Sequence, residues 1–312
     1  MLKLIQNEWM KLWTKKGTWI MTLLLIVLVI GLMGLTKWIN SQNTTEPTDW
    51  KANVQEQLKY TNEALQLDLP ESERKQTEET IKILEYRLAH DIPPLAEDSR
   101  ESLIINPVAI GSLVVLLTVI VAAGIVASEF SQGTIKMLLT RPVKRWKIMT
   151  SKYITVLLFG ILLMFIGFIV TIACAYILFP AGGGQELKWD GNAVVSLSVW
   201  GHGLYMLILS FANVIITATF AFMIGSVFRS NGMAIGLSLF IFFTGNTIVL
   251  LLAKYEIVKY LVFTHMDLTV YENGYPFIEG MTITFSLTVL AVYLVIFLVI
   301  SYMVFTKRDI TA

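Results

Sequence analysis

The sequence predicts an all-α protein that crosses a membrane six times. Six apolar runs of roughly 20 residues hold no Asp, Glu, Lys or Arg, and a helix of that length spans the hydrocarbon core. Of the 312 residues, 55% are hydrophobic and 15% are charged, whereas soluble domains carry about 25% charged residues. Basic residues gather between alternate runs, a pattern typical of cytoplasmic loops in membrane proteins.

The predicted spans follow the apolar runs in order. A charge at the centre of any of them would cost about 2.5–3.5 kcal/mol on insertion, so the absence of charges favours spanning helices. The first run is longer than the apolar part of a signal peptide and ends in Thr36-Lys37-Trp38, so we expect it to stay as an anchor. The six spans are residues 17–36, 106–127, 154–179, 200–227, 233–253 and 282–305.

The distribution of Lys and Arg in the short flanking segments predicts the orientation. The richer side is expected to be cytoplasmic, and an even number of spans places both termini there. The other side holds Lys188, Lys254 and Lys259 in its short loops. The richer side holds Lys3, Lys11, Lys15, Lys16, Lys136, Arg141, Lys144, Arg145, Lys147, Lys152, Arg229, Lys307 and Arg308. The predicted cytoplasmic segments are 1–16, 128–153, 228–232 and 306–312, and the extracellular ones are 37–105, 180–199 and 254–281.

The long outer segment 37–105 is acidic and predicts a helical hairpin. One helical stripe comprises Trp50, Val54, Leu58, Thr61 and Leu65, and a second comprises Thr77, Ile81, Leu84 and Leu88. Pro70 with Glu71 and Glu73 indicates the start of the second helix, because acids are favoured in a first turn. The hairpin is either a small packed unit or a recognition element for a substrate or partner.

Two further segments are expected at the membrane interface. The N-terminal residues 1–16 predict an amphipathic helix with Leu2, Ile5, Trp9, Leu12 and Trp13 on one face, which serves as an anchor or also contacts a soluble partner. Aromatic residues crowd the outer loop 254–281, and this predicts a loop that dips into the interface with short helices near 256–278.

The segment 128–152, SEFSQGTIKMLLTRPVKRWKIMTSK, carries six basic residues and one acid, Glu129. Gly133 lets the chain bend, and the apolar stretch from Thr134 to Leu139 predicts a short helix that ends before Pro142. A second helix from Lys144 is expected to continue into the third span. Charges alone would fit a cytoplasmic anchor, but the apolar stretch favours a docking surface as well.

The chain resembles the ABC-2 type transporter permeases, the membrane subunits of bacterial ATP-driven exporters. The resemblance rests on Glu129-Phe130-Ser131-Gln132-Gly133-Thr134, which is similar to the family's E-x-x-x-G-T motif, and on Arg141-Pro142-Val143-Lys144-Arg145 after it. It extends to the six spans, the amphipathic N-terminal helix, GSVFRSNGMAIG at residues 225–236 and the aromatic loop before the last span.

The resemblance implies a type V exporter-like permease fold with an extracellular helical hairpin, in the bacterial plasma membrane. Segment 129–140 would be the coupling helix that docks on a cytosolic ABC ATPase dimer, and a second permease copy or a related permease would complete the unit. The residues expected to contact the ATPase are Glu129, Gly133, Thr134, Ile135, Lys136, Leu138, Arg141 and Arg145, with Ile5, Trp9 and Trp13 on the N-terminal helix.

Composition and motifs limit the chemistry. The sequence has no G-x-x-x-x-G-K-[ST] motif, the phosphate-binding loop of many ATPases, so ATP and Mg²⁺ are expected to bind the partner. We expect no cofactor and no catalytic residue on this chain. Cys174 and three dispersed histidines predict no disulfide and no metal site, and the net charge of +1 gives no sign of nucleic-acid binding. Uncharged spans favour an external motor and a hydrophobic or amphipathic cargo, such as a peptide, a drug or a lipid-like molecule. The alternatives are a channel or gradient-driven carrier, and a sensory or immunity protein that uses the hairpin without transport.

Overall fold

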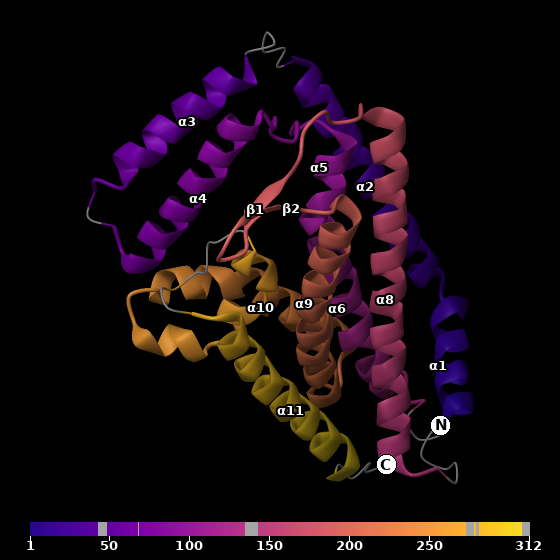
Figure 1. Ribbon diagram of the computed structural model, residues 1–312. Helices are drawn as coiled ribbons and strands as arrows, with labels where there is room; N and C mark the ends of the chain where they lie inside the picture. Colours follow the sequence, from indigo (N-terminus) through magenta and orange to yellow (C-terminus); the bar gives the residue numbers. More distant parts are fainter. Residues whose placement is uncertain (43–48, 68, 135–142, 273–277, 279–280, 308–312) are drawn as a thin grey trace. The chain divides into compact units, whose positions relative to one another are not determined.

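The computed structural model describes residues 1–42, 49–67, 69–134, 143–272, 278 and 281–307. Helices dominate these residues, as the ribbon drawing shows (Figure 1). Among the described residues, six helical segments are long and apolar enough to cross a membrane. The predicted all-α architecture with six spans agrees with this finding.

Each predicted apolar run overlaps one long helix and extends beyond its ends by at most two residues, at 106–107, 179, 253 and 282. Each of these helices is longer than its run. The third spanning helix begins at Arg145, nine residues before the predicted start of the span at 154. The last part of the basic segment 128–152 is therefore helical. The spanning helices are α2 (Lys16–Gln42), α6 (Val108–Ser131), α8 (Arg145–Leu178), α9 (Val199–Val227), α10 (Asn231–Leu252) and α11 (Ile283–Lys307). The short helix α5 (Arg100–Ile105) comes directly before α6.

The chain divides into two compact units, and the first comprises 1–27, 108–167 and 208–312. Within this unit α6 is buried along most of its length, with Val114, Ala122, Ala123 and Val126 shielded from solvent. Small residues let its neighbours approach closely. A Cβ atom added to Gly225 of α9 would clash with the Ala123 carbonyl, so α9 packs directly against the backbone of α6.

The loop between α10 and α11 in the first unit forms three short 3₁₀ helices, at Glu256–Tyr260, Val262–His265 and Leu268–Tyr271. Their position matches the short helices expected near 256–278, although residues 273–277 and 279–280 lie outside the described part of the chain. His265 is fully buried, and its ring lies 2.7 Å from Ser286 Oγ and 2.8 Å from the Lys259 carbonyl oxygen. The hydroxyl partner of His265 therefore comes from α11.

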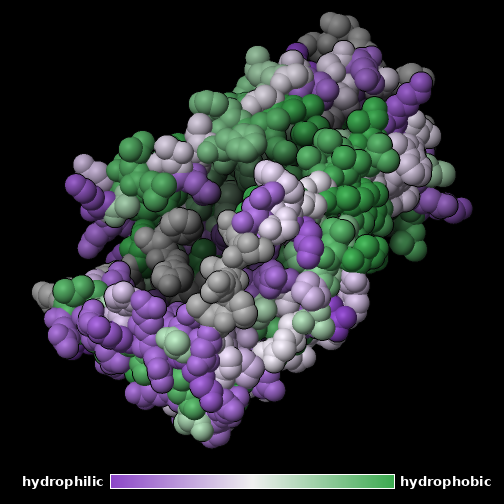
Figure 2. Space-filling view, turned by 90° about the horizontal axis from the view of Figure 1, so that it is seen from above, coloured by the Kyte–Doolittle hydropathy of each residue, from purple (hydrophilic) through white to green (hydrophobic). Residues whose placement is uncertain are grey.

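The second unit comprises 28–107 and 168–207 and contains the predicted hairpin. Its two helices are α3 (Trp50–Ala64) and α4 (Glu71–His90). Val54, Ile81 and Leu84 are buried, as the two apolar stripes predict. In the space-filling view, hydrophilic residues gather mainly in one area of the face shown and hydrophobic residues in another (Figure 2).

The predicted loop 180–199 contains a small antiparallel hairpin that the sequence analysis did not anticipate. Strands β1 (Leu187–Trp189) and β2 (Val194–Ser196) pair across a tight turn. Asp190 accepts hydrogen bonds from the amides of Asn192 and Ala193, and Gly191 adopts a φ of 101°, which glycine tolerates best. The buried Arg87 of α4 holds this loop by donating to the carbonyl oxygens of Pro93 and Gln185.

Candidate functional site

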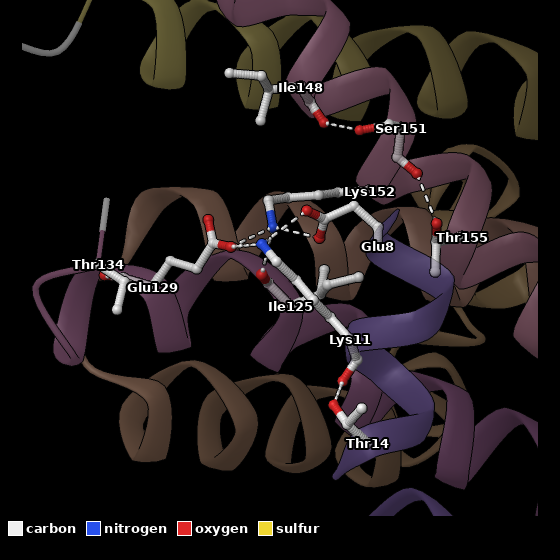
Figure 3. Close-up of polar contacts among 10 residues, drawn as sticks. All are labelled: Glu8, Lys11, Thr14, Ile125, Glu129, Thr134, Ile148, Ser151, Lys152 and Thr155. Carbon is white, nitrogen blue, oxygen red and sulfur yellow. Dashed lines mark hydrogen bonds and ion pairs between the residues drawn. The ribbon is translucent and has the colours of Figure 1, made fainter. Parts of the chain in front are cut away.

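Four charged side chains meet in the first unit where α1 (Leu2–Thr14), the end of α6 and the start of α8 come together (Figure 3). We call Glu8, Lys11, Glu129 and Lys152 the ion-pair cluster. Lys152 Nζ donates hydrogen bonds of 2.7 Å to Glu8 Oε2 and of 2.7 Å to Glu129 Oε1. Lys11 Nζ lies 3.1 Å from Glu8 Oε1 and 3.4 Å from Glu129 Oε1. Two carboxylates therefore balance two ammonium groups.

The cluster is largely removed from solvent. The side chain of Lys152 is 1% exposed, that of Glu8 is 6% exposed and that of Glu129 is 13% exposed. Charges at such depth are costly unless they are paired with good geometry. The short contacts of Lys152 meet that condition, because ionised donors and acceptors form shorter and stronger hydrogen bonds than neutral ones.

Each element brings its charge to the cluster for a local reason. In α1, Glu8 and Leu12 are four residues apart and therefore share a buried face. Thr18 Oγ1 donates a hydrogen bond of 2.6 Å to the Leu12 carbonyl, which fixes the turn from α1 into α2. In α8, Ser151 Oγ donates a hydrogen bond to the Ile148 carbonyl oxygen, and Thr155 Oγ1 donates one to the Ser151 carbonyl oxygen (Figure 3). Both bonds lie next to Lys152 in the helix.

The end of α6 positions Glu129. The helix continues past the apolar run to Ser131, and then Gly133 takes a left-handed φ of 71°. Glycine at this position ends a helix without strain, and the Gly133 amide donates to the Phe130 carbonyl at 3.2 Å. The predicted bend at Gly133 is therefore present.

The electrostatics of the cluster favour the charged forms. Burial by itself would raise the pKa of Glu8, but the charge and hydrogen bond of Lys152, followed by those of Lys11, lower it below the usual 4.5. Burial would lower the pKa of Lys11, but Glu8 and then Glu129 raise it above 10.5. Glu8 and Lys11 are thus charged at neutral pH.

A cavity of about 350 Å³ adjoins the cluster, and Lys15 and Gln132 contribute to its lining beside the four charged residues. Glu129 Oε2 is buried and has no hydrogen-bond partner among the described residues, while Glu129 Oε1 accepts from both lysines. Among the residues that the structure describes, no group of His, Cys, Asp and Glu has the arrangement of a metal site.

Several predicted site residues have other neighbours in the same chain. Arg145 donates a hydrogen bond of 3.0 Å to the Thr306 carbonyl in the last turn of α11. Trp13 packs against Phe159 of α8, with ring centres 6.3 Å apart, while Ile5 and Trp9 are half-buried. Thr134 is exposed and weakly contacts the Glu129 carbonyl at 3.4 Å. The predicted contacts Ile135, Lys136, Leu138 and Arg141, and the second half of the predicted coupling helix (135–140), lie outside the described residues.

The burial of Glu8 in α1 was not predicted. Glu8 is 5% exposed, whereas Leu2, on the predicted apolar face, is 82% exposed. The prediction missed the burial of Lys152 as well, because it counted this residue as a basic anchor. The sequence does contain one signal for this pairing: the acid Glu129 follows the second apolar run, and the base Lys152 precedes the third. Opposite charges at the ends of neighbouring helices can pair.

The comparisons with known proteins cover most of the chain. A family model described as "Protein of unknown function (DUF2705)" matches residues 97–311. The chain belongs to the DUF2705 family. The DUF2705 match includes Glu129 and Lys152 of the cluster and begins after the α3–α4 hairpin.

Two relatives of this DUF2705 protein come from Bacillus subtilis strain 168. The uncharacterized protein YhcI is 38% identical over 317 aligned residues, which cover 99% of each chain. The uncharacterized membrane protein YdbK is 29% identical over 197 residues, which cover 62% of this chain and 76% of YdbK. With its six long apolar helices and a relative of that description, the DUF2705 chain is a membrane protein.

Proposed function

We propose that this protein is the membrane-spanning permease subunit of a bacterial ATP-driven exporter of the ABC-2 type. A separate cytosolic ATPase dimer would dock on the chain between the end of α6 and the start of α8 and drive export of a hydrophobic or amphipathic molecule. The proposal draws on the E-x-x-x-G-T-like motif from Glu129 to Thr134 and on the six apolar helices. The observation that carries it is the pairing of Lys152 with both Glu8 and Glu129.

The pairing matters because of where its members sit in the chain. Glu129 and Lys152 stand on the two helices that flank the proposed docking segment, and Glu8 adds the amphipathic α1. A force applied between Ser131 and Arg145 would therefore act on α6, α8 and α1 together. A desolvated, well-aligned ion pair suits this task, because separating its partners leaves uncompensated charge in a buried place.

The proposed mechanism is mechanical. ATP binding closes the partner ATPase, the docking segment moves, and α6 and α8 tilt with it. Contacts between two permease copies then open or close. ATP hydrolysis belongs to the partner in this proposal, because the sequence has no phosphate-binding P-loop.

Co-purification with the partner tests the proposal. The tagged full-length chain is purified from its native membranes after mild crosslinking, and captured proteins are identified by mass spectrometry. We expect a Walker-motif ATPase in the complex, with ATPase activity that responds to the permease. Glu129→Ala and the double variant Gly133→Val/Ile135→Glu should lose this coupled activity and still insert into the membrane. Glu256→Gln, at an exposed acid in the outer loop, is the matched control and should behave like the wild type.

Two results would contradict the proposal. One is unchanged coupling in both Glu129→Ala and the double variant. The other concerns orientation, which is read by placing a cysteine at the exposed Lys144 in a Cys174→Ser background. Labelling of that cysteine by an impermeant maleimide from outside intact cells would place the docking segment on the wrong side for a cytosolic ATPase.

A further inference from the structure

A second cavity in the first unit, of about 270 Å³, lies between α2, α6 and α10. Its walls are mostly apolar and include Met21, Ile120, Val121 and Ile235, while Lys15 and Asn231 contribute polar groups. We call this cavity the Lys15–Asn231 groove. It shares four lining residues with the cavity beside the ion-pair cluster, namely Lys15, Leu12, Ile125 and Ser128, so the mostly apolar cavity adjoins the charged one there.

Two polar groups of the groove lack a partner among the described residues. No hydrogen bond or ion pair of the Lys15 ammonium is found there, although Lys11 and Lys152 are both paired. The amide oxygen of Asn231 is buried and accepts no hydrogen bond there. A buried acceptor without a donor costs about 1–3 kcal/mol, so a donor supplied by a ligand would be favourable.

The charge around Lys15 favours an anion. Glu8 and Glu129 balance Lys11 and Lys152, so Lys15 adds a positive charge that the described residues of the two cavities leave uncompensated. Partial desolvation, followed by repulsion from Lys152, lowers the pKa of Lys15 although part of its side chain is exposed. A bound phosphate would offset both effects by stabilising the charged ammonium.

Lys15 and Asn231 stand at the same level of the membrane. Lys15 comes just before the first spanning helix, and Asn231 is the first residue of the fifth. Successive spans alternate in direction, so the first and fifth begin on the same side. Both groups are therefore expected at headgroup depth, with Met21 and Ile120 further along their helices toward the acyl chains.

We propose that the Lys15–Asn231 groove binds one anionic phospholipid with a hydroxylated headgroup, of the phosphatidylglycerol class. The lipid phosphate pairs with Lys15, a headgroup hydroxyl donates to Asn231 Oδ1, and an acyl chain lies along the apolar wall. The occupant would fill the space between α2 and α10 and neutralise the excess charge. This site is independent of the proposed ATPase partner.

Native mass spectrometry of the delipidated full-length chain tests the site. Dioleoyl phosphatidylglycerol, phosphatidic acid and phosphatidylcholine are titrated separately, and the dissociation constant of the first bound lipid is measured. We expect phosphatidylglycerol to bind most tightly. Lys15→Gln should weaken both anionic lipids about fivefold, the usual effect of one basic residue near a membrane surface. Lys16→Gln, at an exposed neighbour outside both cavities, is the matched control and should change neither.

Two further experiments distinguish binding of a whole phospholipid from simple attraction of a negative charge. Asn231→Leu should remove the preference for phosphatidylglycerol over phosphatidic acid and leave the affinity for phosphatidic acid unchanged. Glycerol phosphate, which has the headgroup without acyl chains, should fail to displace the lipid. Thermal unfolding of each variant in detergent checks that the fold is retained.

The proposal is overturned by any of four results. They are equal binding of phosphatidylglycerol and phosphatidylcholine, equal weakening by Lys15→Gln and Lys16→Gln, an intact preference for phosphatidylglycerol in Asn231→Leu, and displacement by glycerol phosphate. The last result would assign the groove to a free phosphate compound. Reading the site through lipid affinity keeps its outcome separate from that of the ATPase experiment.

Discussion

The ammonium group of Lys152 lies 2.7 Å from the Glu8 carboxylate, although 144 positions separate the two residues. This contact joins the N-terminal helix α1 to the first turns of α8, and Glu129 extends it to the end of α6. The buried charges stand just beyond the ends of two apolar runs, at the flanks of the proposed docking segment. The cluster is therefore the part of the molecule whose disturbance should be felt by three elements at once.

Removing the central ammonium should destabilise the first unit. Lys152→Met leaves Glu8 and Glu129 as buried carboxylates that Lys11 alone must balance, and such a change typically costs about 3–5 kcal/mol. Lys144→Met, at an exposed lysine, should have little effect. The thermal midpoint of the detergent-solubilised protein measures both variants.

A double-mutant cycle separates pairing from loss of packing. The combination Glu8→Gln/Lys152→Met should cost less than the sum of its two single variants, because the second change removes a charge that the first has left unpaired. Strict additivity would show that Glu8 and Lys152 contribute independently and that the short contact has no energetic role.

Acid should loosen α1 through Glu8. The pKa of Glu8 is held below 4.5 by Lys152 and Lys11 despite its burial, so the stability it contributes is present above that value and is lost as the pH falls through its lower folded-state pKa. Glu8→Gln should flatten the acid side of the stability profile, whereas Glu71→Gln, at an exposed acid of α4, should not. Thermal midpoints between pH 3 and 7 decide this. An acid limb unchanged in Glu8→Gln would contradict the assignment.

Most of the architecture could be predicted from the sequence, because bilayer-length apolar runs and the 3.6-residue period are strong local signals. The stripes through Val54 and through Ile81 and Leu84 specify α3 and α4, and Gly133 marks the end of α6. Tertiary pairs carry no such signal. Nothing in the spacing of Glu8, Glu129 and Lys152 states that they meet, and the positive-inside pattern favours reading Lys152 as an exposed anchor. The β1–β2 hairpin was missed because its strands are three residues long.

Glycine substitutions should distinguish internal packing from open helix surface. Gly225→Ala places a methyl group against the Ala123 carbonyl of α6, a backbone atom that cannot move aside, so we expect a loss of about 1–3 kcal/mol. A Cβ on Gly236 of α10 meets nothing within 4 Å among the described residues, so Gly236→Ala should be neutral or stabilise the helix by up to about 1 kcal/mol.

The same pair of glycine variants also reports on assembly. If Gly236→Ala keeps the thermal midpoint of the single chain but lowers the amount of dimer captured by crosslinking, its open face contacts a second copy of the chain. Equal tolerance of both substitutions in thermal unfolding would contradict the close approach of α9 to α6.

A separate pH effect should arise through His265 in the loop between α10 and α11. Its Nε2 faces the Lys259 carbonyl, which can only accept, so in the neutral ring Nδ1 accepts the Ser286 hydroxyl proton, and Tyr271 donates to Ser286 in turn. Burial lowers the pKa of His265 below 6.5, against a smaller opposing effect of the Lys259 carbonyl. The unfolded chain therefore takes up a proton first, and stability falls as the pH drops from about 6.5 toward the folded-state pKa.

Two histidine variants test this effect. His265→Gln should be less stable than the wild type at pH 8, and its stability should change little between pH 7 and 5. His90→Gln, at an exposed histidine of α4, should keep the pH dependence of the wild type. Hydrogen exchange of residues 256–271 measured across this range localises the effect, and a wild-type slope in His265→Gln would assign it to another group.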